Sequence, residues 1–185
     1  MGTLSLPTIC GHHSLTCVSF KCRNPTIGGT GFTYLDEGAY GVIFADTSLQ
    51  RVRKCFYRRQ PDLAHSARVF ESEVRAYEIA MKSAKLHTLV PEFFCIRPTQ
   101  IILDNYKKDV SDEFIPCLAF EATLIDDNFV KLGAVCVCDV ERQRITKLFA
   151  SEGIKHLKDA SVLLQGKCVV KVIDFAVKEF EFNHH

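Results

Sequence analysis

Two charged side chains in this chain stand in or directly after apolar segments, where a cleft can bring them to one ligand. Lys54 follows Val52 and Arg53 in a run of strand-forming residues, and Asp174 follows the apolar run Val169 to Ile173. A lysine ammonium binds phosphate as a point charge. A carboxylate at the end of a buried strand suits a hard cation such as Mg²⁺. The residue types and their positions predict a phosphate ligand for Lys54 and a metal for Asp174. The alternative roles are a solvated surface lysine and an Asp that caps a turn.

A pair of glycines precedes Lys54, in the segment Leu35 to Phe44. Glycines in a turn between two strands let backbone amides approach phosphate oxygens, because no Cβ intervenes. The same spacing also fits an ordinary hairpin turn. On the first interpretation, the residues predicted to contact a nucleotide are Gly38, Ala39, Tyr40, Gly41 and Ile43.

A glutamate partner for Lys54 is expected on the helix predicted over Asp62 to Leu86. Glu73 lies beside Val74, close to the face that should meet a sheet. A buried Lys needs an opposite charge to offset its desolvation, so the sequence predicts a Lys54–Glu73 pair. Glu71 is the alternative partner, and a solvated surface pair is the alternative role.

The elements that must position these groups predict an α+β fold. Short runs of β-branched and aromatic residues, separated by turn-forming residues, indicate an antiparallel sheet of five strands. The predicted strands are Phe32 to Leu35, Val42 to Asp46, Arg51 to Tyr57, Phe93 to Ile96 followed by Gln100 to Leu103, and Ile115 to Glu121. One long helix follows the third strand, with Pro91 as its expected end. Further along, a helix is predicted over Val140 to Ser151 and a strand pair over Ser161 to Leu164 and Cys168 to Ile173. Residues 1–31 lack periodicity and are expected to form an N-terminal arm before one domain, 32–183.

Composition limits the function classes. The 185 residues include 23 basic and 22 acidic ones, for a net charge of +1. This balance gives no field that attracts nucleic acid or an anionic membrane. No apolar run approaches the roughly 20 residues of a membrane span, and the first residues lack a secretory pattern, so we expect a cytoplasmic protein.

The nine cysteines are odd in number, so we expect reduced thiols. Cys17, Cys22, Cys136 and Cys138 are expected to be buried.

In their order, these motifs resemble those of the protein kinase superfamily. Leu35 to Phe44 resembles the glycine-rich loop, with Asp36 in place of the first glycine. Val52-Arg53-Lys54 resembles the strand of the phosphate-binding lysine, and Phe70 to Tyr77 resembles the helix of its glutamate partner. Ile173-Asp174-Phe175-Ala176 resembles the metal-binding DFG motif, with Ala in place of Gly. The resemblance covers about Tyr34 to Glu179 and implies ATP and Mg²⁺ as ligands.

The resemblance also implies how adenine is held. Leu118 to Thr123 is similar to the strand that leads into the kinase hinge, which makes Phe120 the gatekeeper. Backbone groups of Glu121 and Thr123 are then expected to meet adenine. Leu163, in the apolar stretch after the catalytic loop, is a further implied ATP contact.

The catalytic loop departs from the kinase pattern. His156 matches, Asp159 is the candidate base, and Ser161 stands where a metal-binding Asn is expected. The sequence stops within a dozen residues of Asp174, so the resemblance includes no activation segment and implies a strongly reduced C-lobe. It predicts a minimal kinase, Ser/Thr-type, similar to those that bacterial pathogens deliver into host cells, acting on a host or partner protein.

Two alternatives remain open at this point. The altered loop around Asp159 and the Ala after Phe175 also fit a pseudokinase, which binds a partner protein without chemistry. The Ile-Asp-Phe-Ala sequence also occurs in inositol-phosphate kinases, so a small-molecule kinase is a third interpretation. Those enzymes lack a glycine-rich loop of the kind present here.

Overall fold

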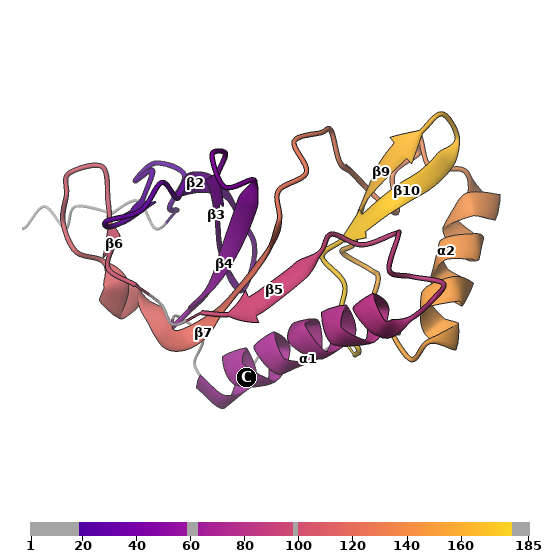
Figure 1. Cartoon of the computed structure of the whole chain (residues 1–185), viewed down its shortest axis with the longest axis horizontal. Coiled ribbons are helices and arrows are strands. Elements are labelled where there is room, and N and C mark those ends of the chain that lie inside the picture. Colours follow the sequence, from indigo (N-terminus) through magenta and orange to yellow (C-terminus); the bar gives the residue numbers. More distant parts are fainter. Residues whose placement is uncertain (1–18, 59–62, 98–99, 179–185) are drawn as a thin grey trace, which may run out of the picture.

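A computed structural model describes residues 19–58, 63–97 and 100–178 of the chain. These residues form an α+β fold with a seven-stranded and a three-stranded sheet, both antiparallel, and two α-helices. The large sheet occupies one half of the molecule, and β9, β10 and α2 occupy the other, while α1 runs alongside both (Figure 1). None of the helices in the described part of the chain is long and apolar enough to span a bilayer.

The large sheet has the strand order β5-β7-β4-β3-β2-β1-β6. Its strands are β1 (Thr26–Ile27), β2 (Thr33–Glu37), β3 (Gly41–Asp46), β4 (Arg51–Tyr57), β5 (Phe93–Ile96), β6 (Ile102–Leu103) and β7 (Phe114–Thr123). Five of them correspond to the strands predicted from the sequence, and β4 and β5 have the predicted bounds. The segment predicted over Gln100 to Leu103 differs: only its last two residues form a strand, which pairs with β1 at the opposite edge from β5.

The two faces of this sheet carry different side chains, as strand alternation requires. On β4, Lys54 lies in register with Ile43 of β3 and Phe120 of β7. The neighbouring residues Arg53 and Cys55 point to the other face. The face that carries Lys54 is the inner one, because α1 and the second half of the molecule cover it.

The outer face is covered by the chain before β2 and by the segment before β7. Its buried cluster includes Phe20, Ile27, Phe32, Phe44 and Phe114. Phe20 has no exposed surface, and its ring lies 5.5 Å from that of Tyr57 and 5.2 Å from that of Phe114. Residues 19–31, which the sequence predicts as part of an arm, are therefore packed into the domain.

Helix α1 (Leu63–Lys82) buries one side against the inner face. Val69, Val74 and Tyr77 recur at helical spacing and are all buried. The helix ends at Lys82, before the predicted Leu86 and Pro91. After Lys82 the chain continues in turns, in which the Ser83 carbonyl accepts from the N–H groups of Leu86 and His87 and the Ser83 hydroxyl accepts from the N–H of Lys85. Serine hydroxyls form such local hydrogen bonds to the backbone at helix ends and turns.

The second half contains α2 (Asp139–Ser151) and a small sheet. The sheet consists of β8 (Val130–Lys131), β9 (Ser161–Gln165) and β10 (Cys168–Ile173), in the order β10-β9-β8. Glu141 connects α2 to β10, since its carboxylate accepts from the Arg144 guanidinium at 2.6 Å and from the Val169 N–H at 2.7 Å. These hydrogen bonds, the one from Arg144 first, lower the pKa of Glu141 to about 2.

Aromatic rings join the two halves. Tyr77 of α1 stacks on Phe93 of β5 at 5.5 Å, and its ring lies 4.6 Å from that of Phe175, which follows β10. Phe175 in turn meets Phe149 of α2 edge-on at 5.2 Å. All except the partly buried Phe93 belong to one buried hydrophobic cluster. Sheet, helix and second half therefore share a core.

The cysteines differ from the sequence prediction in their burial. Within the described ranges they are all free thiols. Cys22, Cys136 and Cys138 are exposed, so their predicted role as buried small residues is wrong. Cys55 is buried, and burial raises the pKa of its thiol to about 12. Cys17 lies outside the described residues.

Candidate functional site

A cleft lies between the inner face of the large sheet and the second half of the molecule. It consists of two cavities of about 700 Å³ and about 490 Å³. The cavities share the residues Asp36, Ile43, Lys54, Glu73, Lys131 and Asp174, so they form one continuous space. Volumes of this size are typical of small-molecule sites.

The ion pair between Lys54 and Glu73 forms one wall of the cleft. The Nζ of Lys54 lies 2.6 Å from Oε2 of Glu73, and the two side chains are 14% and 11% exposed. Burial alone would lower the pKa of Lys54, but attraction from Glu73 and Asp174 outweighs it and raises the pKa. Burial raises the pKa of Glu73, although Lys54 opposes this. Glu71 is exposed, so Glu73, and not the alternative Glu71, is the partner of Lys54 on β4.

Asp174 lies across the cleft from that pair, at the end of β10. Its side chain is 36% exposed, and it lines both cavities together with Lys54. The two charged groups singled out in the sequence thus reach one space. Asp174 also has a φ of 59°, in the left-handed region that residues with a Cβ seldom adopt. Such backbone conformations are concentrated at functional sites.

The smaller cavity is an apolar slot beside these charges. Its apolar lining comes from the sheet, the segment after β7 and the end of β10: Leu35, Val52, Phe120, Ala122, Ile125, Phe129 and Ile173. Two carboxylates, Asp126 and Asp127, line it in addition to Asp36, Glu73 and Asp174. Apolar walls with a few polar groups are typical of small-molecule sites.

Of the two predicted adenine contacts on β7, Thr123 lines the slot and Glu121 does not. The N–H of Thr123 already donates to the carbonyl of Glu92 at 2.9 Å. Glu121 lies inside β7, between β4 and β5, and does not line the slot. Residues 124–127, directly after β7, line the slot together with Thr123.

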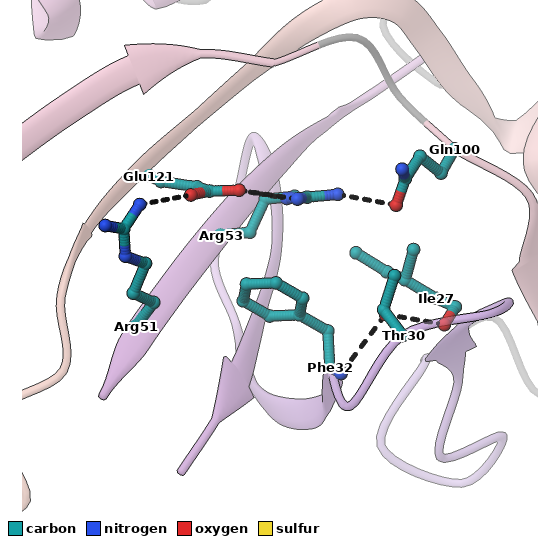
Figure 2. A network of polar contacts seen from close by, with 7 residues as sticks. All are labelled: Ile27, Thr30, Phe32, Arg51, Arg53, Gln100 and Glu121. Atoms are coloured by element: carbon teal, nitrogen blue, oxygen red, sulfur yellow. Dashed lines mark hydrogen bonds and ion pairs between the residues drawn. The ribbon is translucent and has the colours of Figure 1, made fainter. Parts of the chain in front are cut away.

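The side chain of Glu121 belongs to a polar network on the outer face (Figure 2). Its carboxylate accepts from Nε of Arg53 at 2.9 Å and from Nη1 of Arg51 at 3.2 Å. Arg53 also donates to Oε1 of Gln100 at 2.9 Å, and its guanidinium lies 4.5 Å from the centre of the Phe32 ring. This network lies on the outer face of the sheet, so the side chain of Glu121 does not reach the cleft.

The turn between β2 and β3, here called the glycine hairpin (residues 38–41), covers the larger cavity. Gly38, Ala39 and Tyr40 line that cavity, whereas Gly41 does not. A Cβ on Gly41 would lie 2.3 Å from the carbonyl oxygen of Cys55, but one on Gly38 would meet nothing within 4 Å. Gly41 is therefore required by close packing on β4. The chain around Gly38 leaves room for a ligand.

Of the three remaining predicted site residues, two line a cavity and one does not. Asp159 lines the larger cavity, with its carboxylate 76% exposed and 3.8 Å from Nε2 of His156. Ser161 is buried and lines the slot. Leu163 lines neither cavity, and Ile173 of the paired strand β10 takes its predicted place.

Lys131 is a residue of the cleft that the sequence analysis missed. Its Nζ donates to the backbone carbonyl of Asp159 at 2.8 Å and lies 4.0 Å from Oδ2 of Asp174. It comes from β8, a two-residue strand without any periodic pattern. Only its pairing with Ser161 across β8 and β9 brings it to the site, and no sequence signal indicates that pairing.

The carboxylates present suit one kind of metal site. Among residues 19–58, 63–97 and 100–178, no group of three or more His, Cys, Asp or Glu residues could hold a metal ion. An all-protein metal cage is therefore absent from this part of the chain. Mg²⁺ is commonly held by one or two carboxylates together with substrate phosphates, and Asp174 is a carboxylate that lines both cavities.

Comparisons with protein-family models, with curated proteins and with solved structures found no match.

Proposed function

We propose that this chain is a minimal protein-kinase-like phosphotransferase that binds ATP with Mg²⁺ in the cleft. One observation carries the proposal: Lys54, held by Glu73, and Asp174 line the same space, beside an apolar slot. The order of the motifs and the strand order β5-β7-β4-β3-β2 with α1 across it support a kinase-like N-lobe. The proposed acceptor is a protein hydroxyl.

Each part of the cleft then has a task. The slot takes adenine, with segment 124–127 at its edge, and the glycine hairpin covers the phosphates. Lys54 neutralises phosphate oxygens, and its pair with Glu73 fixes its direction. Asp174 would hold Mg²⁺, which would supply charge neutralisation at the phosphates.

The reaction needs little more than positioning and charge. The acceptor hydroxyl oxygen attacks the terminal phosphorus, and the bond from that phosphorus to the bridging oxygen breaks, so ADP leaves. The hydroxyl proton goes to the Asp159 carboxylate, which is accessible to a protein substrate because it is 76% exposed. Asp159 then returns the proton to solvent.

A transfer assay with γ-labelled ATP and Mg²⁺ tests the proposal, with candidate proteins and the chain itself as acceptors. We expect label on protein with the wild type and none with Asp174→Asn. Asp112→Asn is the matched control, because Asp112 is exposed and lines neither cavity. Equal labelling by both variants, or none by the wild type, contradicts phosphoryl transfer.

The alternative is a pseudokinase that binds nucleotide or a partner protein without transfer. The exposed carboxylate of Asp159 favours it, because 3.8 Å to His156 is too long for a hydrogen bond that would orient a base. Thermal melting separates the two proposals. A rise in melting temperature with MgATP, but without labelling, favours the pseudokinase, and no rise favours a pure interaction module.

A further inference from the structure

Lys131 places an ammonium in the cleft, opposite Lys54; Lys158 and Lys178 line the larger cavity but not the slot. The side chain of Lys131 is 62% exposed, lines both cavities, and lies 4.0 Å from Asp174. A lysine on an exposed two-residue strand would normally point into solvent. Here the hydrogen bond to the carbonyl of Asp159 directs the ammonium into the space between Asp174 and Asp159.

The position of Lys131 relative to Ser161 indicates its role. Ser161 stands where the kinase pattern has an Asn that binds a second metal ion, and a neutral, buried hydroxyl is a weaker ligand. Lys131 is paired in register with Ser161. A cation this close to Asp174 repels a further divalent ion through Coulomb interaction. The ammonium can supply the positive charge in that ion's place.

The contact with Asp159 indicates which phosphate is involved. On the proposed function, the acceptor hydroxyl and the terminal phosphate meet beside Asp159. Lys54 approaches from the sheet and α1, whereas Lys131 is fixed on the Asp159 side. The two lysines therefore face different parts of a bound triphosphate.

We propose that Lys131 binds the terminal phosphate of ATP beside Asp174, in place of a second divalent ion. The proposal depends on the proposed nucleotide site. It predicts that the chain discriminates ATP from ADP through Lys131, and that nucleotide binding brings one divalent ion to the site.

Calorimetric titration of the full chain with ATP and with ADP, each with Mg²⁺, tests this. Lys131→Met should weaken ATP binding by about ten-fold, the effect of one charge-assisted phosphate contact, and leave ADP affinity within about two-fold. Lys131→Arg should keep the preference for ATP. Lys155→Met is the control, because Lys155 is exposed and lines neither cavity; both affinities should match the wild type.

A count of bound Mn²⁺ ions per ATP-loaded chain, by electron paramagnetic resonance, gives a second readout. We expect one ion. Equal weakening of ATP and ADP by Lys131→Met, or two bound ions in the wild type, overturns the assignment of Lys131 while the nucleotide site stands. If the wild type binds neither nucleotide, the proposed function fails, and the assignment fails with it.

Discussion

The Nζ of Lys54 lies 2.6 Å from Oε2 of Glu73, in an ion pair that joins β4 to α1. Both side chains are almost fully buried, so each charge depends on the other. The pair fixes the direction of the lysine before any ligand arrives. Through this pair, Lys54 contributes to the stability of the fold as well as to the candidate site.

We expect Lys54→Met to destabilise the fold by about 3 kcal/mol, because removal of one partner leaves a buried charge uncompensated. The pKa of Glu73, already raised by burial, should rise further without Lys54. The native variant then holds a proton that the unfolded chain releases, so the loss should be larger at pH 8 than at pH 5. Urea unfolding at the two pH values measures this.

The double variant Lys54→Met/Glu73→Gln is the control for that prediction. It has no charge at either position, so it should recover part of the lost stability and lose the pH dependence. A double variant less stable than Lys54→Met would contradict the role of the unpaired carboxylate.

Asp174→Asn should remove most of the melting-temperature rise that MgATP produces, because the carboxylate proposed to hold Mg²⁺ becomes a neutral amide. Loss of such an electrostatic group should also slow any transfer by about 100-fold or more. Asp112→Asn should behave as the wild type. Thermal melting with and without MgATP tests binding separately from chemistry, and an unchanged rise in Asp174→Asn counts against the metal assignment.

Substitution by alanine should affect stability at one glycine of the hairpin and ligand binding at the other. Gly41→Ala places a Cβ 2.3 Å from the Cys55 carbonyl, so it should cost about 1–3 kcal/mol of stability, as overpacking does. Gly38→Ala meets no protein atom within 4 Å and should keep the stability of the wild type, while it weakens ATP binding. Chemical unfolding and calorimetric titration of both variants decide between structural and ligand roles.

Glu141 should make stability depend on pH in the acid range. Its pKa is lowered from 4.5 to about 2 by Arg144 and the Val169 N–H. A lowered native pKa gives stability that is present above pH 4.5 and lost as the pH falls through about 2. The loss should be about 1–2 kcal/mol, because Arg144 is 48% exposed and solvent screens the pair. Glu141→Gln should be less stable at pH 7 and lack this part of the acid dependence in unfolding titrations; an unchanged acid profile contradicts the assignment.

The regular elements could be predicted from the sequence because their side-chain periods are strong. β4, β5 and β10 have the predicted bounds, and the buried residues of α1 recur at helical spacing. The two-residue strands β1 and β8 were missed, since two residues define no period. β6 was predicted too long and without its partner β1, because register against a distant strand is a tertiary property.

The residues of the candidate site also differ in whether a sequence pattern reveals them. Lys54, Glu73 and Asp174 could be found because each stands in or beside a periodic apolar segment. Lys131 could not, because only the register of β8 with β9 brings it to the cleft. Leu163 was predicted from the resemblance alone, without a pattern of its own, and it lines neither cavity.

The shared aromatic core has a mechanical consequence for the cleft. Phe175 touches Tyr77 on one side and Phe149 on the other, directly after Asp174. A wide rotation of one half against the other would separate these rings and expose them to water, which the hydrophobic effect opposes. The separation of the two walls of the cleft is therefore held by this buried core.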